Sequence, residues 1–307
     1  MAIISKLLRN RNFILILAIV LGLTIGEPVA SKTQSLVLPL LALVMTLSAT
    51  NITSREFTSL KNMPRPILTS LLLNYAVLGG LILLLAWWLI DDRELWTGFV
   101  ILSTVPPAVA VVPFSYALGG NTIFSLMGMA GAYLAALVVM PVAMALFLGI
   151  EFFEPVKLLL ILGELILIPI VVSRILLATK LDKRIAKWRG TMTNWSFFVA
   201  LFTIVGLNRQ AFFGEFDILL RIIIIAVATS FVLAYIIELV TKALRVDRAT
   251  SISLTLMGTL KNYGLASGIL LTLFGERAAI PASVCTVFGI SMLVWMGFHF
   301  RKPSKVS

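Results

Sequence analysis

The sequence has 307 residues, of which 60% are hydrophobic and 13% are charged. A soluble domain carries about 25% charged residues, so this composition excludes an ordinary cytosolic enzyme. The net charge of +11 comes from basic residues placed between apolar runs, which excludes a nucleic-acid-binding patch and indicates a protein whose partner is the lipid bilayer.

Apolar runs long enough to cross a bilayer follow one another along the whole chain. A spanning helix needs about 20 mostly apolar residues, and only a helix or a closed barrel satisfies its backbone in lipid. None of the runs alternates as a barrel strand does, so we predict an all-α membrane protein with ten transmembrane helices. The predicted spans are 12–30, 33–51, 65–90, 96–118, 121–149, 155–179, 191–208, 216–240, 249–274 and 279–300.

Basic residues mark one side of the membrane. They gather at the N-terminus, in the second, sixth and eighth connections and in the tail, whereas the other connections are rich in acidic residues. Because Lys and Arg stay preferentially cytoplasmic, we predict a multi-pass protein of the inner (plasma) membrane with both termini in the cytoplasm. The residues concerned are Lys6, Arg9, Arg11, Arg55, Lys61, Arg65, Lys180, Lys183, Arg184, Lys187, Arg189, Lys242, Arg245, Arg248, Arg301, Lys302 and Lys305.

The ten predicted spans divide into two sets of five near residue 150. The first set, residues 1–150, begins inside the cell, and the second set, residues 151–307, begins outside. The halves therefore have opposite topology, and we predict a 5+5 inverted repeat, an arrangement typical of secondary transporters.

The fourth span of each half carries residues that interrupt a helix. Span four contains Pro106, Pro107 and Pro113, and span nine contains Lys261 and Asn262 among three glycines. Interruptions at matching positions of two halves indicate a transporter's binding site, and free amide groups at broken helix ends suit an anion. Simple kinks are the structural alternative, since proline and glycine are common in membrane helices.

Lys261 is predicted to lie near the middle of the bilayer. A charge there costs about 2.5–3.5 kcal/mol, so its side chain must face a cavity or a partner. It lies too far from either end of its span to reach an interface, whereas Arg174 is interpreted as snorkelling. Two roles remain open: a fixed cation that attracts the substrate, or a titrating group that couples transport to protons. Glu164 and Glu238 are candidate partners of Lys261.

These features predict a substrate site for a small organic anion at the two interruptions. A pocket of aromatic and amide side chains beside a lysine suits a monocarboxylate with an apolar body. The candidate substrate-binding residues are Lys261, Asn262, Tyr263, Pro106, Pro107 and Phe114.

No cofactor or metal site is predicted. The sequence has one histidine, His299, and one cysteine, Cys285, which excludes a disulfide and a Cys/His metal cluster. The spans contain no serine–histidine pair or other catalytic pattern, so we do not predict an enzyme.

Two motifs resemble those of the bile acid:sodium symporter family, also called SBF-like or BASS transporters. In span four they are Pro106, Tyr116, Gly120, Asn121 and Ser125, and in span nine the run is Lys261-Asn262-Tyr263-Gly264-Leu265. The resemblance covers nearly the whole chain. It implies a panel domain of spans one, two, six and seven and a core domain of spans three to five and eight to ten. It also implies that spans four and nine cross at unwound centres and that transport proceeds by alternating access.

The chain departs from the family at the positions that the resemblance assigns to sodium ligands. These positions are Val111, Val112, Met257 and Lys261. Valine and methionine offer no hard oxygen to a sodium ion, and lysine adds a positive charge where the ion would bind. Only Ser125 and Asn74 remain as ion-coupling candidates beside Lys261. Our hypothesis is that the Lys261 ammonium replaces the ion and makes transport independent of sodium.

The sequence therefore predicts a secondary transporter of a small organic anion, without sodium coupling and with protons as an alternative coupling ion. A sodium-coupled organic acid symporter with atypical sites is one alternative. Auxin-efflux-type carriers and arsenite efflux proteins share the broad architecture. From a different class comes a non-transporting membrane sensor or scaffold with the same fold.

Overall fold

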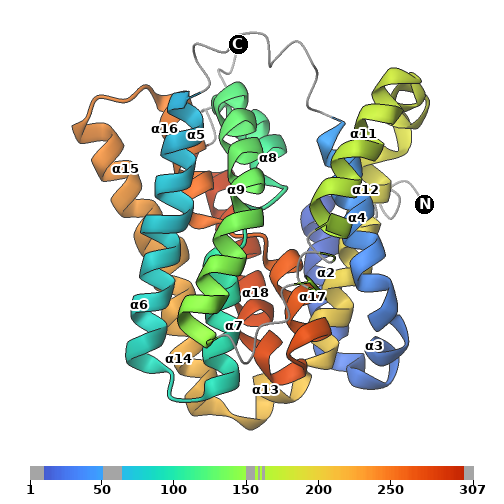
Figure 1. The fold of residues 1–307 in the computed structure, drawn as a ribbon, viewed down its shortest axis with the longest axis vertical. Helices are drawn as coiled ribbons and strands as arrows, with labels where there is room; N and C mark the ends of the chain where they lie inside the picture. Colours follow the sequence, from blue (N-terminus) through green and yellow to red (C-terminus); the bar gives the residue numbers. More distant parts are fainter. Residues whose placement is uncertain (1–9, 51–63, 150–155, 158–159, 161–162, 301–307) are drawn as a thin grey trace.

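A computed structural model of the chain describes residues 10–50, 64–149, 156–157, 160 and 163–300. The predicted cytoplasmic termini and the predicted second connection, with Arg55 and Lys61, lie outside the described residues. The described chain is built from helices, most of which run along the long axis of the molecule (Figure 1).

The first half contains α2 (Arg11–Ile25), α3 (Glu27–Thr33), η1 (Gln34–Leu36), α4 (Val37–Ala49), α5 (Pro64–Leu71), η4 (Leu72–Gly79), α6 (Gly80–Leu89), α7 (Arg93–Thr104), α8 (Val111–Leu118) and α9 (Thr122–Leu148). The second half contains η6 (Gly163–Leu167), α11 (Ile168–Ala178), α12 (Leu181–Leu207), α13 (Arg209–Gly214), α14 (Phe216–Val227), η7 (Ala228–Val232), α15 (Leu233–Ala243), α16 (Arg248–Thr259), α17 (Tyr263–Leu273) and α18 (Glu276–His299). Of the η elements, η1 is a 3-10 turn and the others are π-helical turns.

Within the described residues, six helices are long and apolar enough to cross a membrane, and shorter apolar helices lie among them. The six are Glu27–Ala49, Pro64–Leu89, Thr122–Leu148, Leu181–Leu207, Phe216–Ala243 and Glu276–His299. The protein is therefore a multi-pass helical membrane protein.

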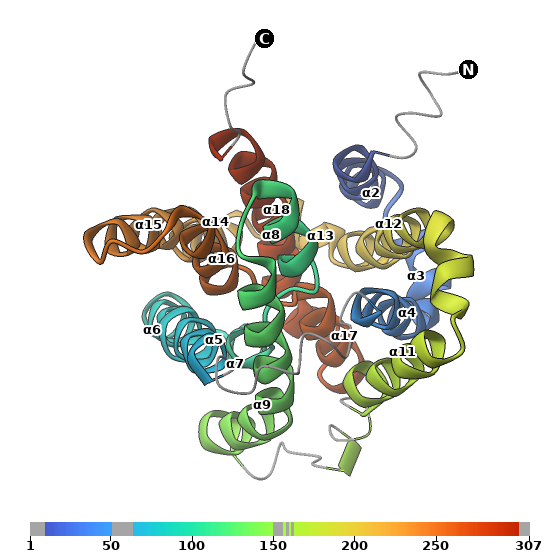
Figure 2. The same cartoon turned by 90° about the horizontal axis from the view of Figure 1, so that it is seen from above.

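The helices form two groups, which are separated most clearly in the view from above (Figure 2). In the small bundle, α12 packs against α2, α3 and α4, and α4 also packs against α11. The large bundle contains α5 to α9 and α14 to α18, in which α7 packs against α9 and α18, and α5 against α9. Contacts of α17 with α4 and of α18 with α12 join the two bundles, so the boundary between them passes beside the two broken helices.

The limit between the first two predicted spans is wrong by several residues. The prediction ends the first span at residue 30, whereas α2 ends at Ile25 and α3 begins at Glu27. Between them Gly26 has a φ of +69°, a left-handed conformation that glycine adopts without strain, and Pro28 follows in the first turn of α3. Hydropathy along the sequence does not reveal such a turn, because apolar residues lie on both sides of it.

The predicted sixth connection is also wrong in part, because its basic residues are helical. The prediction begins the seventh span at residue 191, but α12 begins at Leu181 and includes Lys183, Arg184 and Lys187. Lysine and arginine are good helix formers, so the apolar helix continues through them. At 27 residues α12 is about 40 Å long, more than the roughly 30 Å of hydrocarbon that a span must cross.

An ion network joins three elements at the face where α7, α14 and α18 begin. Arg277 donates to Glu215 through Nη1 (2.8 Å) and Nη2 (3.0 Å), and its Nε donates to Asp92 (2.9 Å). Asp92 also caps α7, since its Oδ1 accepts from the Leu95 amide at 2.9 Å. Partial burial opposes ionisation of Asp92, but the Leu95 amide and Arg277 outweigh it and lower the pKa of that carboxyl. The hydrogen bond from Arg277 lowers the pKa of Glu215.

This network predicts a loss of stability in acid. Because both carboxyl groups have pKa values below the ordinary 3.8 and 4.5, their stabilising contribution is present at neutral pH and is lost as the pH falls through the folded-state values. We expect the melting temperature of the purified protein to fall below about pH 4.5, modestly because solvent screens these half-exposed groups. Arg277→Gln should lower the melting temperature at pH 7 and flatten its fall. An equal fall in both proteins contradicts the prediction.

Candidate functional site

Two helices of the large bundle are broken at the predicted positions. The first break separates α7 from α8 over residues 105–110, and the second separates α16 from α17 over residues 260–262. In Figure 1, α8 and α16 lie in the upper half of the molecule and α7 and α17 in the lower half, so both breaks lie near mid-height. Pro106 and Pro107 end α7 because neither has the amide proton that another helical turn requires.

The two breaks pair with each other through their backbones. Pro107 and Lys261 form an isolated antiparallel bridge. The Ala108 amide donates to the Leu260 carbonyl (3.1 Å), and the Asn262 amide donates to the Pro106 carbonyl (2.8 Å). Backbone groups that the breaks leave without helical partners are thus satisfied across the crossing, which fixes both segments inside the bundle.

The side chain of Lys261 is fully buried and its ammonium is surrounded by oxygen atoms. Nζ donates to the Asn74 carbonyl (2.9 Å), Asn74 Oδ1 (2.9 Å), the Ser103 carbonyl (2.6 Å) and the Val105 carbonyl (3.0 Å). It also lies 5.0 Å from the ring centroid of Tyr75, within range of a cation–π interaction. We call these four oxygen atoms the oxygen cage.

Breaks in helical hydrogen bonding make the cage oxygens available. In a continuous helix the Ser103 carbonyl would accept from residue 107, but Pro107 has no amide proton to donate. The Asn74 carbonyl belongs to the π-helical turn η4, a local insertion of a kind found mostly at functional sites. The ammonium also lies at the C-terminal end of α7, where the helix dipole is negative.

Neither carboxylate considered as a partner of Lys261 contacts it. Glu164 is exposed, and Glu238 pairs through Oε2 with His299 Nε2 at 3.0 Å. Within the described chain, the contacts of Lys261 Nζ are therefore carbonyl and amide oxygens and the Tyr75 ring, and none of them is a carboxylate. This arrangement resembles the binding of a metal cation more than a salt bridge.

Close packing of η4 on α7 gives a test of the cage. A Cβ on Gly79 would lie 2.6 Å from the Ser103 carbonyl oxygen, which is backbone and a member of the cage. We expect Gly79→Ala to displace this oxygen and to destabilise the protein by about 1–3 kcal/mol. Gly80→Ala is the matched control, since nothing lies within 4 Å of a Cβ there. Equal melting temperatures for the two variants would exclude tight packing at the cage.

Asn262 organises the second break. Its Oδ1 accepts from the Leu265 amide (3.1 Å) and so caps α17, while its Nδ2 donates to the Tyr133 hydroxyl (2.9 Å). The Tyr133 hydroxyl donates in turn to the Pro107 carbonyl (3.0 Å) in the first break. Asn262 thus connects α17, α9 and the first break in one chain of hydrogen bonds.

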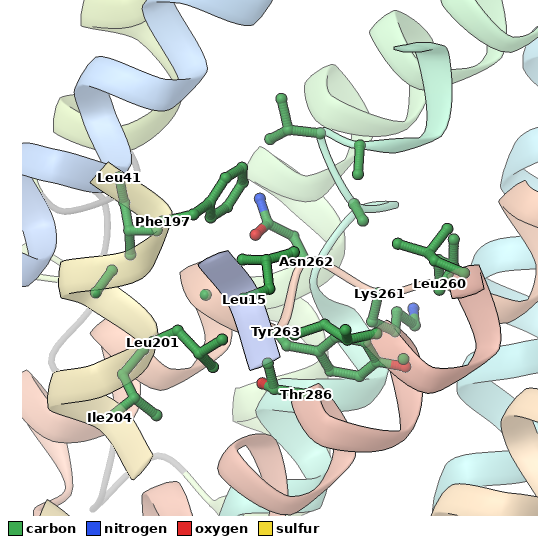
Figure 3. A pocket seen from close by; sticks show the side chains of 18 residues that line it. Leu15, Leu41, Phe197, Leu201, Ile204, Leu260, Lys261, Asn262, Tyr263 and Thr286 are labelled. Atoms are coloured by element: carbon green, nitrogen blue, oxygen red, sulfur yellow. The ribbon is translucent and has the colours of Figure 1, made fainter. Parts of the chain in front are cut away.

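A central cavity of about 90 Å³ lies beside the crossing, between the two bundles (Figure 3). Phe197, Leu201 and Ile204 of α12 form one wall, and Asn262 and Tyr263 form part of the other. Both breaks contribute to the lining, which is almost wholly apolar. The cavity could hold the apolar body of a small molecule, with the amide of Asn262 near it.

The structure brings some of the predicted substrate residues together and separates others. Lys261, Asn262 and Tyr263 line the central cavity, but Nζ of Lys261 points away from α12 toward η4 and α7 (Figure 3). Pro106 and Pro107 lie at the crossing and act through their carbonyl groups. Phe114 lies on α8, packs against the hydrophobic core and is not part of this lining.

Several lining residues have no signal in the sequence. Ala108, Val109 and Ala110 line the central cavity through their place in the first break. Tyr133 reaches the crossing from α9, far away in the chain. Because Pro106 and Pro107 interrupt a helix, a buried donor for a freed carbonyl could have been expected, and the Tyr133 hydroxyl is that donor.

Ser125, one of the predicted ion-coupling residues, lies beside Ser70 and the Met257 side chain. Ser125 and Ser70 are fully buried, and neither hydroxyl has a hydrogen-bond partner within the described chain. A Cβ on Gly128 would lie 2.1 Å from the terminal methyl of Met257 and 2.9 Å from Ser70 Cβ, so the Met257 side chain fills the space between α5 and α9. A thioether offers no hard oxygen to sodium. Across the described residues, no three His, Cys, Asp or Glu side chains form a group that could bind a metal.

Two broken helices that pair inside a helical membrane bundle, with a cavity beside them, define the protein as a membrane transporter by its architecture. The model of the Sodium Bile acid symporter family matches residues 38–214, more than half of the sequence, and the chain belongs to this family. The match includes the first break and ends before the second, so Lys261 lies beyond it. Among curated proteins, none matches the chain.

Proposed function

We propose that the protein is a secondary transporter of a small organic anion that works by alternating access without sodium coupling. The observation that carries this proposal is the oxygen cage around the Lys261 ammonium. A tethered ammonium supplies the positive charge that a bound cation would supply, but it cannot dissociate. Transport would then neither require nor consume a sodium gradient.

The proposal includes a ten-span architecture with two inverted repeats of five. Support comes from two features that recur in corresponding spans. The third span of each half contains a π-helical turn, η4 or η7, and the fourth span of each half is broken. In this scheme the small bundle is the panel, the large bundle is the core, and substrate binds in the cavity between them.

Orientation in the inner membrane, with both termini in the cytoplasm, is also proposed. It is supported by basic residues at helix ends on the upper face in Figure 1, where α11 ends, α12 begins and α15 ends. Lys180, Lys183, Lys242 and Arg245 lie at these ends. The opposite face carries Asp92, the first residue before α7.

The proposal is tested by uptake into proteoliposomes. A thermal-shift screen of aliphatic and aromatic monocarboxylates would first identify an anion that stabilises the purified protein, because a ligand that binds the native state raises its melting temperature. We expect uptake of that anion at the same rate in sodium, potassium and choline media. Strong stimulation by a sodium gradient would overturn sodium independence. Binding without counterflow would identify a sensor or scaffold instead.

A further inference from the structure

A second cavity, of about 580 Å³, lies at the face of the large bundle where α8 and α18 end and α16 begins. In Figure 1 this is the upper face, well above the two breaks. Its wall carries polar as well as apolar surface, whereas the wall of the central cavity is almost wholly apolar. The residues that matter below are Tyr116, Arg248, Gly297 and Phe300. We call it the Arg248 cavity.

Arg248 is the one charged residue among the described residues that line this cavity. Its Nη2 donates to the Phe300 carbonyl at the end of α18 (3.0 Å), and within the described chain its guanidinium forms no ion pair. The adjacent carboxylate, Asp247, accepts from the Thr250 amide (3.0 Å) and is not part of the lining. Because a guanidinium has five N–H donors in a planar fork, donors remain for the oxygen atoms of an anion.

The Arg248 cavity lies at the depth of the lipid headgroups. The 24 residues of α18 make a helix of about 36 Å, longer than the roughly 30 Å of hydrocarbon, so its last turn extends among the headgroups. Tyr116, which is 78% exposed, and Phe300 line the cavity with Arg248, and aromatic side chains are typical of this depth. The anions that a membrane presents there are phospholipid phosphates, which arginine binds through paired hydrogen bonds.

A cavity at the opposite face gives an internal comparison. It has about 360 Å³ and is formed where α7 begins and α9 and α17 end, the same three kinds of helix end. Here too an arginine follows the capping aspartate, since Asp92-Arg93 begins α7 as Asp247-Arg248 begins α16. However, Glu94 lines this cavity together with Arg93, so the two charges cancel. Of the two cavities, the Arg248 cavity has the excess positive charge that favours an anion.

We propose that the Arg248 cavity binds the phosphate of an anionic phospholipid in the leaflet where α8 and α18 end. The Arg248 guanidinium pairs with the phosphate oxygens, the Tyr116 hydroxyl donates to one of them, and Phe300 packs against the apolar part of the lipid. A net negative lipid is favoured over a zwitterionic one, because the lining supplies a cation and no carboxylate. Since α16 runs from this cavity to the second break, the bound lipid fixes the outer end of a helix that carries the crossing.

The test measures lipid binding through the melting temperature of the purified full chain in detergent. Phosphatidylglycerol and phosphatidylcholine are titrated into the micelles, because a ligand of the native state raises its melting temperature. We expect phosphatidylglycerol to stabilise the wild type at a lower mole fraction than phosphatidylcholine. Arg248→Gln should need on the order of tenfold to a hundredfold more phosphatidylglycerol for the same shift. Arg245→Gln, which removes an exposed arginine outside the lining, should respond as the wild type does.

Two substitutions at Gly297 keep the test valid if Arg248→Gln does not fold. A Cβ on Gly297 would meet no atom within 4 Å, so a side chain can be added at this wall without displacing the protein. Gly297→Glu brings a carboxylate to the cavity, and Gly297→Gln brings a neutral side chain of the same size. We expect the glutamate variant to lose the response to phosphatidylglycerol and the glutamine variant to keep most of it.

A structural role of Arg248 predicts a different pattern. If Arg248 only holds the end of α18 through Phe300, Arg248→Gln melts at a lower temperature but responds to phosphatidylglycerol as the wild type does, which would overturn the inference. Equal stabilisation of the wild type by the two lipids, or equal responses of the two Gly297 variants, would overturn it as well. Inorganic phosphate that stabilises the wild type as strongly as the lipid would assign the cavity to a soluble anion instead. None of these outcomes depends on uptake, which tests the proposed transport function separately.

Discussion

Lys261→Gln is expected to convert the protein into one that sodium stabilises. The substitution removes the ammonium and leaves the carbonyls of Asn74, Ser103 and Val105 without their donor. Each buried acceptor left unsatisfied costs about 1–3 kcal/mol, so the melting temperature should fall in sodium-free buffer. The glutamine adds an oxygen to the cage, and a sodium ion can then take the place of Nζ among several hard oxygens.

The expected measurement is a melting temperature that rises with sodium concentration in Lys261→Gln and is flat in the wild type. An ion that binds only the folded state stabilises it by mass action, so the slope reports the affinity of the cage. Lys261→Met is the matched control: its side chain has a similar length, fills the cage without charge and offers sodium no oxygen. It should be destabilised without any response to sodium, and potassium or choline should not replace sodium in the glutamine variant.

The same variants test whether the Lys261 ammonium replaces a coupling ion or binds the substrate. If the ammonium stands in for a coupling ion, uptake by Lys261→Gln becomes dependent on a sodium gradient while uptake by the wild type does not. A wild-type melting temperature that already rises with sodium would contradict the proposal directly. So would a glutamine variant that loses all transport in every salt, since that result would assign the lysine to substrate binding.

The positions of the helices could be predicted from the sequence because they follow from local chemistry. An apolar run of about 20 residues is helical in lipid whatever its neighbours are, and α9 at Thr122–Leu148 lies within one residue of the predicted limits. The two breaks follow from Pro106 and Pro107 and from the glycines near Lys261 in the same local way. Gly26 and the helical Lys183 were missed because turn conformation and helix length depend on packing and not on hydropathy.

The direction of the Lys261 side chain could not be predicted, because its partners come from η4 and the end of α7, both more than 150 residues away in the sequence. The cost of a buried charge requires a partner but does not name one, and the sequence offered Glu164 and Glu238 only as candidates. The actual partners are the carbonyl oxygens of Asn74, Ser103 and Val105 and the side-chain oxygen of Asn74. Asn74 was an ion-coupling candidate, but the carbonyl oxygens carry no residue-type signal for cation binding. Phe114 was placed at the site because it is near the break in sequence, but α8 carries it away from the cavity.

The partner of Arg174 could not be predicted from the sequence. A single arginine within about one turn of the end of an apolar helix is expected to extend to the membrane surface. In the structure, the Ala49 carbonyl at the end of α4 accepts a hydrogen bond from the Arg174 guanidinium. The sequence separates these two residues by 125 positions.

Asn262→Asp is expected to abolish transport of an anion while preserving the fold. The change keeps the size of the side chain and the oxygen that accepts from the Leu265 amide, so the cap of α17 is retained. The other atom changes from a donor toward Tyr133 into a negatively charged oxygen at the edge of the central cavity. A carboxylate substrate about 5 Å away would be repelled by about 3 kcal/mol at an effective dielectric of 20, or roughly a hundredfold in affinity.

Asn262→Ala separates this repulsion from the loss of the hydrogen bonds. It removes the cap and the donor without adding charge, so it should lower stability by about 1–2 kcal/mol but weaken anion binding far less than the aspartate does. Uptake of the anion identified by the thermal-shift screen, measured at pH 7.5 and again at pH 5.5, gives the decisive comparison. Acidification should restore part of the uptake in Asn262→Asp, because protonation removes the repulsive charge, and should not do so in Asn262→Ala. An aspartate variant that transports the anion at the wild-type rate would show that the substrate's charge passes the crossing elsewhere, and that the cavity beside Asn262 is not on its route.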